Sequence, residues 1–96
     1  MKAVVIVYYE ALDEELGELL EANGVMNYTK WTKVQGRGSG SGAHTLTNVW
    51  PKGNNVLFCA MEDDVATSLF PILAELRTKY RSEGVKVFQL PVEVIM

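Results

Sequence analysis

The segment from Gly36 to His44 carries the groups in this chain that are best suited to contact an anion. Four glycines and two serines fall within it, together with Arg37 and the only histidine of the chain. Glycines let backbone amides approach a phosphate closely, while arginine and protonated histidine supply positive charge. The composition therefore leaves three interpretations: a phosphate-binding loop, a flexible tether, or a loop that contacts a partner.

The two classical nucleotide-binding loops are excluded by context. A P-loop needs GxxxxGK[ST] between a strand and a helix, so that amides and a lysine converge on the phosphates. Here the glycines lie between two predicted strands and no lysine follows them directly. The GxGxxG spacing and βαβ context of a dinucleotide site are also missing. Because a long flexible excursion inside a small domain is usually functional, we favour a recognition loop over an unconstrained insertion.

Charge is distributed unevenly around this loop. No Asp or Glu occurs between residues 22 and 61, whereas Lys30, Lys33, Arg37 and Lys52 all fall there, on a chain of net charge −3. Attraction of an anion to the loop base and protection of strand edges by lysines explain this pattern equally well. The acidic balance of the whole chain excludes nucleic acid and anionic membranes as general partners.

Other chemically interesting residues have ordinary explanations. His44 is a candidate metal ligand only if a symmetric oligomer gathers several copies, because no Cys, Asp or Glu lies near it in sequence. Cys59 lies in an apolar run and is predicted to be a core residue. Trp31 and Trp50 flank the loop and either stack on a ligand or pack across strands. Nothing in the sequence defines a catalytic arrangement, so the chain is predicted not to be an enzyme.

Six regular segments are predicted to position the loop. β-Branched and aromatic runs predict strands over 2–9, 25–35, 55–61 and 85–95, with a further strand stem over 45–50. Apolar residues at helical spacing predict helices over 11–23 and 62–81. The order is βαββαβ, which is the α+β, ferredoxin-like arrangement: an antiparallel sheet with two helices on one face and a long glycine-rich loop between strands 2 and 3.

Three residues lead to specific predictions about the two helices. Gly24 is predicted to end the first helix. Gly17 lies inside that helix, where glycine is unfavourable, so a close neighbour is expected to pack there. Pro71 is expected to kink the second helix or to divide it in two.

The strands at 3–9 and 56–61 are apolar at nearly every position, on both faces. An antiparallel sheet with one solvated face alternates instead, so the face without helices is predicted to be covered by another copy of the chain. We expect residues 1–96 to form a single domain, cytoplasmic and without a membrane-spanning segment.

Three motifs resemble the nitrogen-regulatory P-II signalling proteins. "VQGRGSGSGAH" (34–44) is similar to the base of their T-loop, and "VWPKGNNVLFCAMEDDVATSL" (49–69) resembles their return strand and acidic helix start. "GVKVFQLPVEVI" (84–95) is similar to their closing strand and the Pro-Val-Glu that follows it. The resemblance covers almost the whole chain.

This resemblance implies a homotrimeric, ferredoxin-like, non-enzymatic sensor. It implies that an anionic effector, with adenine nucleotides as the first candidates, binds in clefts between subunits at the loop base. The ligand-binding residues implied in this way are Thr29, Gly36, Arg37, Gly38 and Lys86. A T-loop-like segment over about 36–53 would contact a regulated protein, such as a membrane transporter or an enzyme, through Ser39, Ser41, His44, Trp50 and Lys52.

Two alternatives remain open. The chain also resembles the CutA-type trimers, which share the fold, and would then bind a metal through His44 in metal tolerance or efflux. A small ferredoxin-like enzyme or a purely structural oligomer is the third hypothesis.

Overall fold

The computed structural model describes residues 1–38, 42–44 and 53–96. Its elements are β1 (Lys2–Tyr9), the short 3-10 helix η1 (Glu10–Leu12), α1 (Asp13–Ala22), β2 (Thr29–Val34), β3 (Gly36–Gly38), β4 (Gly42–His44), β5 (Asn54–Met61), α2 (Asp63–Lys79) and β6 (Val85–Pro91). The predicted βαββαβ order is confirmed, with a two-stranded hairpin, β3–β4, inserted after β2. The strand stem predicted over 45–50 lies outside the described residues.

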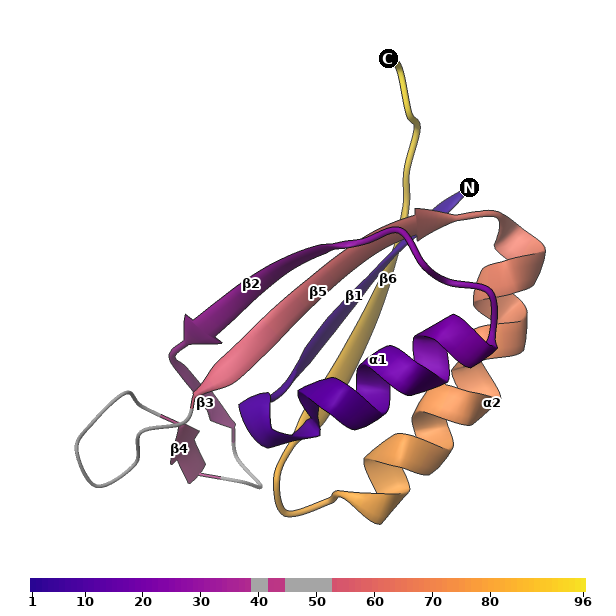
Figure 1. Cartoon of the computed structure of the whole chain (residues 1–96). Helices are drawn as coiled ribbons and strands as arrows, with labels where there is room; N and C mark the ends of the chain where they lie inside the picture. The colour runs from indigo at the N-terminus through magenta and orange to yellow at the C-terminus, as the bar shows by residue number, and fades with distance from the viewer. Residues whose placement is uncertain (39–41, 45–52) are drawn as a thin grey trace.

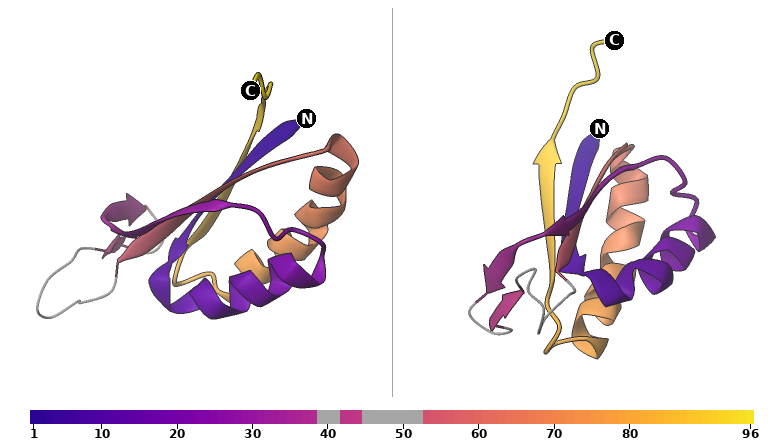
Figure 2. Two further views of the ribbon diagram at one scale, coloured as in Figure 1. Left: turned by 45° about the horizontal axis from the view of Figure 1, so that its top comes forward. Right: turned by 60° about the vertical axis from the view of Figure 1, so that its left-hand side comes forward.

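The main sheet has the strand order β2-β5-β1-β6, and all its neighbouring strands are antiparallel. Both helices lie against the same face of this sheet (Figures 1 and 2). The ferredoxin-like prediction is therefore confirmed. β2 and β6 are the two edge strands, and they lie on opposite sides of the sheet.

The core fills the space between the helices and the sheet. On β1, alternate residues point toward the helices and are buried, namely Val4, Ile6 and Tyr8. Leu57 and Cys59 of β5 extend this layer, and the helices close it with Leu16, Leu20, Leu69 and Leu73. Cys59 is 2% exposed, as predicted for a core residue, and burial raises the pKa of its thiol.

The opposite face of the sheet is apolar and carries no helix; we call it the open face. Cross-strand neighbours share a face, so the register places Trp31, Val56 and Val7 in one row and Phe58, Val5 and Phe88 in the next. Trp31 is 52% exposed and Phe88 47%. The sequence prediction that both faces of the central strands are apolar is confirmed.

α1 ends where glycine was predicted to end it. Gly24 has φ of +81°, and the amides of Gly24 and Val25 donate to the carbonyls of Glu21 and Leu20. This pattern is a Schellman motif, and the residue that follows the glycine, Val25, is buried as such motifs favour. It also explains why β2 begins at Thr29 and not at residue 25, where the sequence predicted it: Val25 belongs to the helix end.

Gly17 differs from its expectation, and Pro71 does not divide α2, so a kink there stays a prediction. A β-carbon added at Gly17 would meet nothing within 4 Å, so the predicted close neighbour is wrong. α2 runs as one helix from Asp63 to Lys79 with Pro71 inside it, so the helix is not divided. Packing of Leu69, Leu73 and Leu76 against the sheet holds the helical turns on either side of the proline. No helix in the described part of the chain is long and apolar enough to cross a membrane.

Candidate functional site

The chain leaves β2 at a bulge that begins the glycine-rich segment. The register between β2 and β5 shifts between Trp31 and Val34, and Lys33 has φ of 55°. A bulge bends its strand and redirects the chain, and a non-glycine residue with positive φ needs support from its surroundings. That support comes from Asn55 of β5, whose Oδ1 accepts a hydrogen bond of 3.2 Å from the Lys33 amide.

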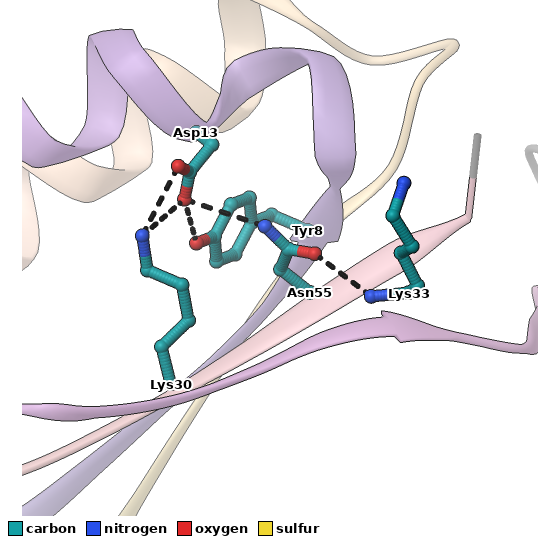
Figure 3. A network of polar contacts seen from close by, with 5 residues as sticks. All are labelled: Tyr8, Asp13, Lys30, Lys33 and Asn55. Atoms are coloured by element: carbon teal, nitrogen blue, oxygen red, sulfur yellow. Dashed lines mark hydrogen bonds and ion pairs between the residues drawn. The ribbon is translucent and has the colours of Figure 1, made fainter.

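The carboxylate of Asp13, the first residue of α1, connects this bulge to the body of the protein (Figure 3). It accepts hydrogen bonds from the Tyr8 hydroxyl (2.6 Å) and from Asn55 Nδ2 (3.3 Å). Lys30 Nζ lies 2.8 Å from its Oδ1. Asn55 is 2% exposed and bonds at both ends of its amide, so it joins α1 to β2 through the interior of the sheet.

The electrostatics of this network favour a charged Asp13 and a neutral Tyr8. Burial by itself raises the pKa of Asp13, but the hydrogen bonds from Lys30 and Tyr8 outweigh it and lower the pKa below the usual 3.8. Burial and the hydrogen bond to Asp13 raise the pKa of the Tyr8 phenol well above its ordinary value. Tyr8 therefore acts as a hydrogen-bond donor and not as a proton source near neutral pH.

Glu10 holds the other end of the glycine-rich segment. Its Oε1 lies 3.0 Å from Lys33 Nζ, and its Oε2 accepts a hydrogen bond of 3.3 Å from the amide of Gly53. The Glu10 amide in turn donates to the Gly53 carbonyl at 2.9 Å. Residues 10 and 13 thus anchor the chain both where it leaves β2 and where it returns to β5. Sequence reasoning did not find this role, because contacts between residues so far apart in the sequence leave no local pattern.

The glycine at position 36 has a packing reason of its own. A β-carbon there would overlap the side-chain amide of Asn54, so only glycine fits without displacing it. The β3–β4 hairpin pairs Gly36 with His44, Arg37 with Ala43 and Gly38 with Gly42. Backbone amides of the loop base are therefore ordered by a hairpin next to the end of β5.

The model of the nitrogen regulatory protein P-II family matches residues 1–96, the whole of this chain. The chain belongs to the P-II family. The resemblance seen in the sequence is thus confirmed, and the family is one of regulatory signalling proteins. A comparison with curated protein sequences gives no match.

Solved structures of P-II-like proteins share the fold. CPII, a nitrogen regulatory PII-like protein from Thiomonas intermedia K12 solved with ADP, AMP and bicarbonate, is 22% identical with a TM-score of 0.77, over 97% of this chain and 86% of that chain. Its apo form is 20% identical with a TM-score of 0.66, over 95% and 89%. A PII-like signalling protein from Thermus thermophilus is 24% identical with a TM-score of 0.70, over 98% and 88%.

The residues that the P-II resemblance implied as ligand-binding lie at three places. Gly36, Arg37 and Gly38 form β3 at the loop base. Lys86 is exposed near the start of β6, opposite Val7 of β1, and Thr29 is exposed at the start of β2, opposite Phe58. Within one copy, Thr29 and Lys86 lie on opposite edge strands, and these strands are three strand spacings or about 14 Å apart. One copy does not bring them together.

The residues predicted to contact a partner lie mostly outside the described part of the chain. Ser39, Ser41, Trp50 and Lys52 are among them, and of His44 the structure gives only the backbone, in β4. Over residues 1–38, 42–44 and 53–96, no group of three or more His, Cys, Asp or Glu side chains is placed to hold a metal. A role of His44 as a metal ligand remains a prediction.

Proposed function

We propose that this chain is a non-enzymatic regulatory protein that assembles as a homotrimer and binds a small anionic effector between subunits. An adenine nucleotide is the leading candidate, because P-II-like CPII was solved with ADP and AMP. The segment 36–53 then contacts a regulated protein, such as a transporter or an enzyme, in the cytoplasm. The whole chain, 1–96, acts as one domain in this proposal.

The placement of Thr29 and Lys86 is the observation that carries the proposal. Both side chains lie in rows of the open face, at its opposite edges, and that face is apolar and uncovered. Copies that pack through this face and meet edge to edge bring Thr29 of one copy toward Lys86 of the next. The loop base, Gly36 to Gly38, follows β2 and adds backbone amides and Arg37. Amides and point charges from two copies are the groups that a phosphate needs.

Thermal unfolding against a panel of ligands tests effector binding. The panel contains ATP, ADP, AMP, cyclic nucleotides, bicarbonate and divalent metals. A ligand at ~100 times its dissociation constant adds about 2.7 kcal/mol to the free energy of unfolding. Arg37→Ala and Lys86→Ala should abolish the shift, whereas Arg81→Ala, a cation beyond the end of α2, should keep it. A shift with metals alone, lost in His44→Ala, would contradict the proposal and favour the CutA-like alternative.

A complementation experiment tests whether the site lies between subunits. Thr29→Glu and Lys86→Gln each remove effector binding if both residues contact the ligand. Co-refolding the two variants then creates clefts with a native Thr29 from one copy and a native Lys86 from the other, about a quarter of all clefts by random assortment in a closed ring. Binding recovered in the mixture supports a shared site. A mixture as inactive as its parents contradicts it.

A further inference from the structure

One carboxylate, that of Glu10, contacts the chain on both sides of the glycine-rich segment. The chain leaves β2 at Lys33, whose Nζ lies 3.0 Å from Glu10 Oε1. It returns at Gly53, whose amide donates to Glu10 Oε2 at 3.3 Å and whose carbonyl accepts from the Glu10 amide at 2.9 Å. Lys33 and Gly53 are thus joined through a residue of η1, which belongs to neither of the two strands.

The two side-chain contacts of Glu10 depend on each other because a carboxylate is one rigid planar group. When Lys33 holds Oε1, the direction in which Oε2 points is also fixed. The side chain of Glu10 is 23% exposed and that of Lys33 is 60% exposed, so the anion is partly shielded from water while its cation is not. Without this cation the carboxylate gains by turning toward water, and its hydrogen bond to the buried Gly53 weakens.

Lys33 is also the point at which the loop base acts on the rest of the chain. Its φ of 55° and the register shift between Trp31 and Val34 make a bulge, a backbone conformation that persists only where its surroundings hold it. The loop base, Gly36 to Gly38, follows this bulge closely in the chain. A ligand that orders the loop base therefore orders the bulge, and with it the ion pair to Glu10.

Lys33 has no direct part in the proposed effector cleft. Its side chain extends to the same side of the sheet as Asp13, which is the helix side (Figure 3). The proposed cleft borders the open face instead. An influence of Lys33 on the return of the chain therefore runs through Glu10.

We propose that Glu10 couples the backbone at Lys33 to the backbone at Gly53. The coupling has two states: the carboxylate either holds both contacts or turns to water and releases both. Resting on the proposed function, it transmits effector binding at the loop base to Gly53, the residue that follows Lys52 of the predicted partner contact. Glu10 and Lys33 are positioning residues in this proposal, and neither contacts the effector.

Hydrogen exchange of the Gly53 amide, measured by NMR in the ligand-free protein, tests the coupling. Lys33→Gln should make this amide exchange about threefold faster, within the effect of up to about fivefold that an exposed ion pair has. Lys33→Arg keeps the charge and should restore the native rate. Lys79→Gln is the matched control, because Lys79 pairs with Glu15 of α1 at 3.0 Å and its side chain is 62% exposed. It should leave the exchange rate at Gly53 unchanged.

Two comparisons separate the coupling from a general loss of stability. The Val25 amide, which donates to Leu20 at the end of α1, should keep its exchange rate in Lys33→Gln. In Glu10→Ala, which lacks the shared carboxylate, adding Lys33→Gln should accelerate exchange at Gly53 no further. An unchanged Gly53 rate in Lys33→Gln, an equal acceleration at Val25, or a further acceleration in the double variant would overturn the proposal.

The same measurement with ADP separates this proposal from the effector proposal. ADP should slow exchange at Gly53 at least threefold relative to Val25 in the native protein. In Lys33→Gln this slowing should disappear while thermal stabilisation by ADP persists. Stabilisation of the native protein without slower exchange at Gly53 would contradict the transmission and leave the effector proposal standing. Absence of any stabilisation by ADP would contradict ADP as the effector, and the ligand-free rates would still decide the coupling.

Discussion

At the scale of single residues, Asn55 decides how the chain enters the glycine-rich segment. It is the buried polar side chain of the described core, and its amide bonds to Asp13 on one side and to the Lys33 backbone on the other. Lys33 has the positive φ that makes the bulge. Asp13 and Glu10 then hold both ends of the segment to the start of α1. These contacts fix the direction of the loop base before any ligand binds.

Asn55→Ala is expected to lower the free energy of unfolding by about 2 kcal/mol. The substitution removes the two hydrogen bonds that the Asn55 side chain makes to the Lys33 amide and to Asp13, and each such bond contributes about 0.5–1.5 kcal/mol. Urea denaturation measures the difference. Asn23→Ala is the control, because the Asn23 side chain bonds to Leu19 at an exposed position, and it should cost less than about 0.5 kcal/mol.

Asp13 is expected to make a contribution to the free energy of unfolding that is lost at low pH. Its folded-state pKa lies below 3.8, so its contribution is complete above that pH and is lost as the pH falls through the lower, folded pKa. Asp13→Asn removes this contribution at every pH. The free energy of unfolding of the variant should therefore fall less steeply than that of the native chain below about pH 4. Unfolding curves between pH 2 and 7, compared for the two proteins, measure this. If the free energies of unfolding of the two proteins fall with the same slope below about pH 4, the contribution assigned to Asp13 is contradicted.

At the scale of elements, α1 shows two glycines with opposite roles. Gly24 ends the helix with φ of +81°, a conformation that other residues adopt only with strain. Gly17 lies in the helix interior with open space where a β-carbon would be. The sequence analysis interpreted Gly17 as a sign of close packing. In the structure, no neighbouring atom lies within 4 Å of the position that a β-carbon would take there.

Gly17→Ala is therefore expected to stabilise the protein by about 0.5–1 kcal/mol, since alanine is the better helix residue and meets no neighbour. Gly24→Ala should destabilise it by about 1 kcal/mol, because its φ is unfavourable for an L-residue. Thermal and urea unfolding of both variants measure the two changes in the free energy of unfolding. Destabilisation by Gly17→Ala would mean that position 17 is covered in the assembled protein, for instance by another copy.

At the scale of the whole molecule, the sheet has one face covered by helices and one apolar face without cover. Trp31, Phe88 and Leu90 are each about half exposed on the open face. Exposed apolar surface of this kind marks an interface. The two edge strands border the same face, so assembly and effector binding are coupled in the proposed trimer.

Phe88→Glu is expected to convert the assembly to monomers, because a charge within an apolar interface is left unpaired. Sedimentation velocity measures the mass. Gln89→Glu is the matched control: it adds the same charge on the next residue, which the register places on the other side of the sheet opposite Val4. An oligomer that survives Phe88→Glu would show that the open face is not the interface.

The sequence alone determined the order of the main elements, the C-terminal end of α1 and the apolar character of both sheet faces. These follow from local periodicity and from glycine conformation, which act over a few residues. The fold and the family followed from the same segments. The resemblance to the family named the residues implied as ligand-binding, but it did not give their positions relative to one another.

Only the tertiary structure decided which side chains meet. Asp13 contacts Lys30 and Asn55, which are 17 and 42 residues away. Such pairs depend on strand order and register, which no local pattern encodes, because each strand could pair with several others at a similar local cost. The separation of Thr29 from Lys86 on opposite edges is likewise a property of the sheet, and it makes a second copy necessary for a shared site.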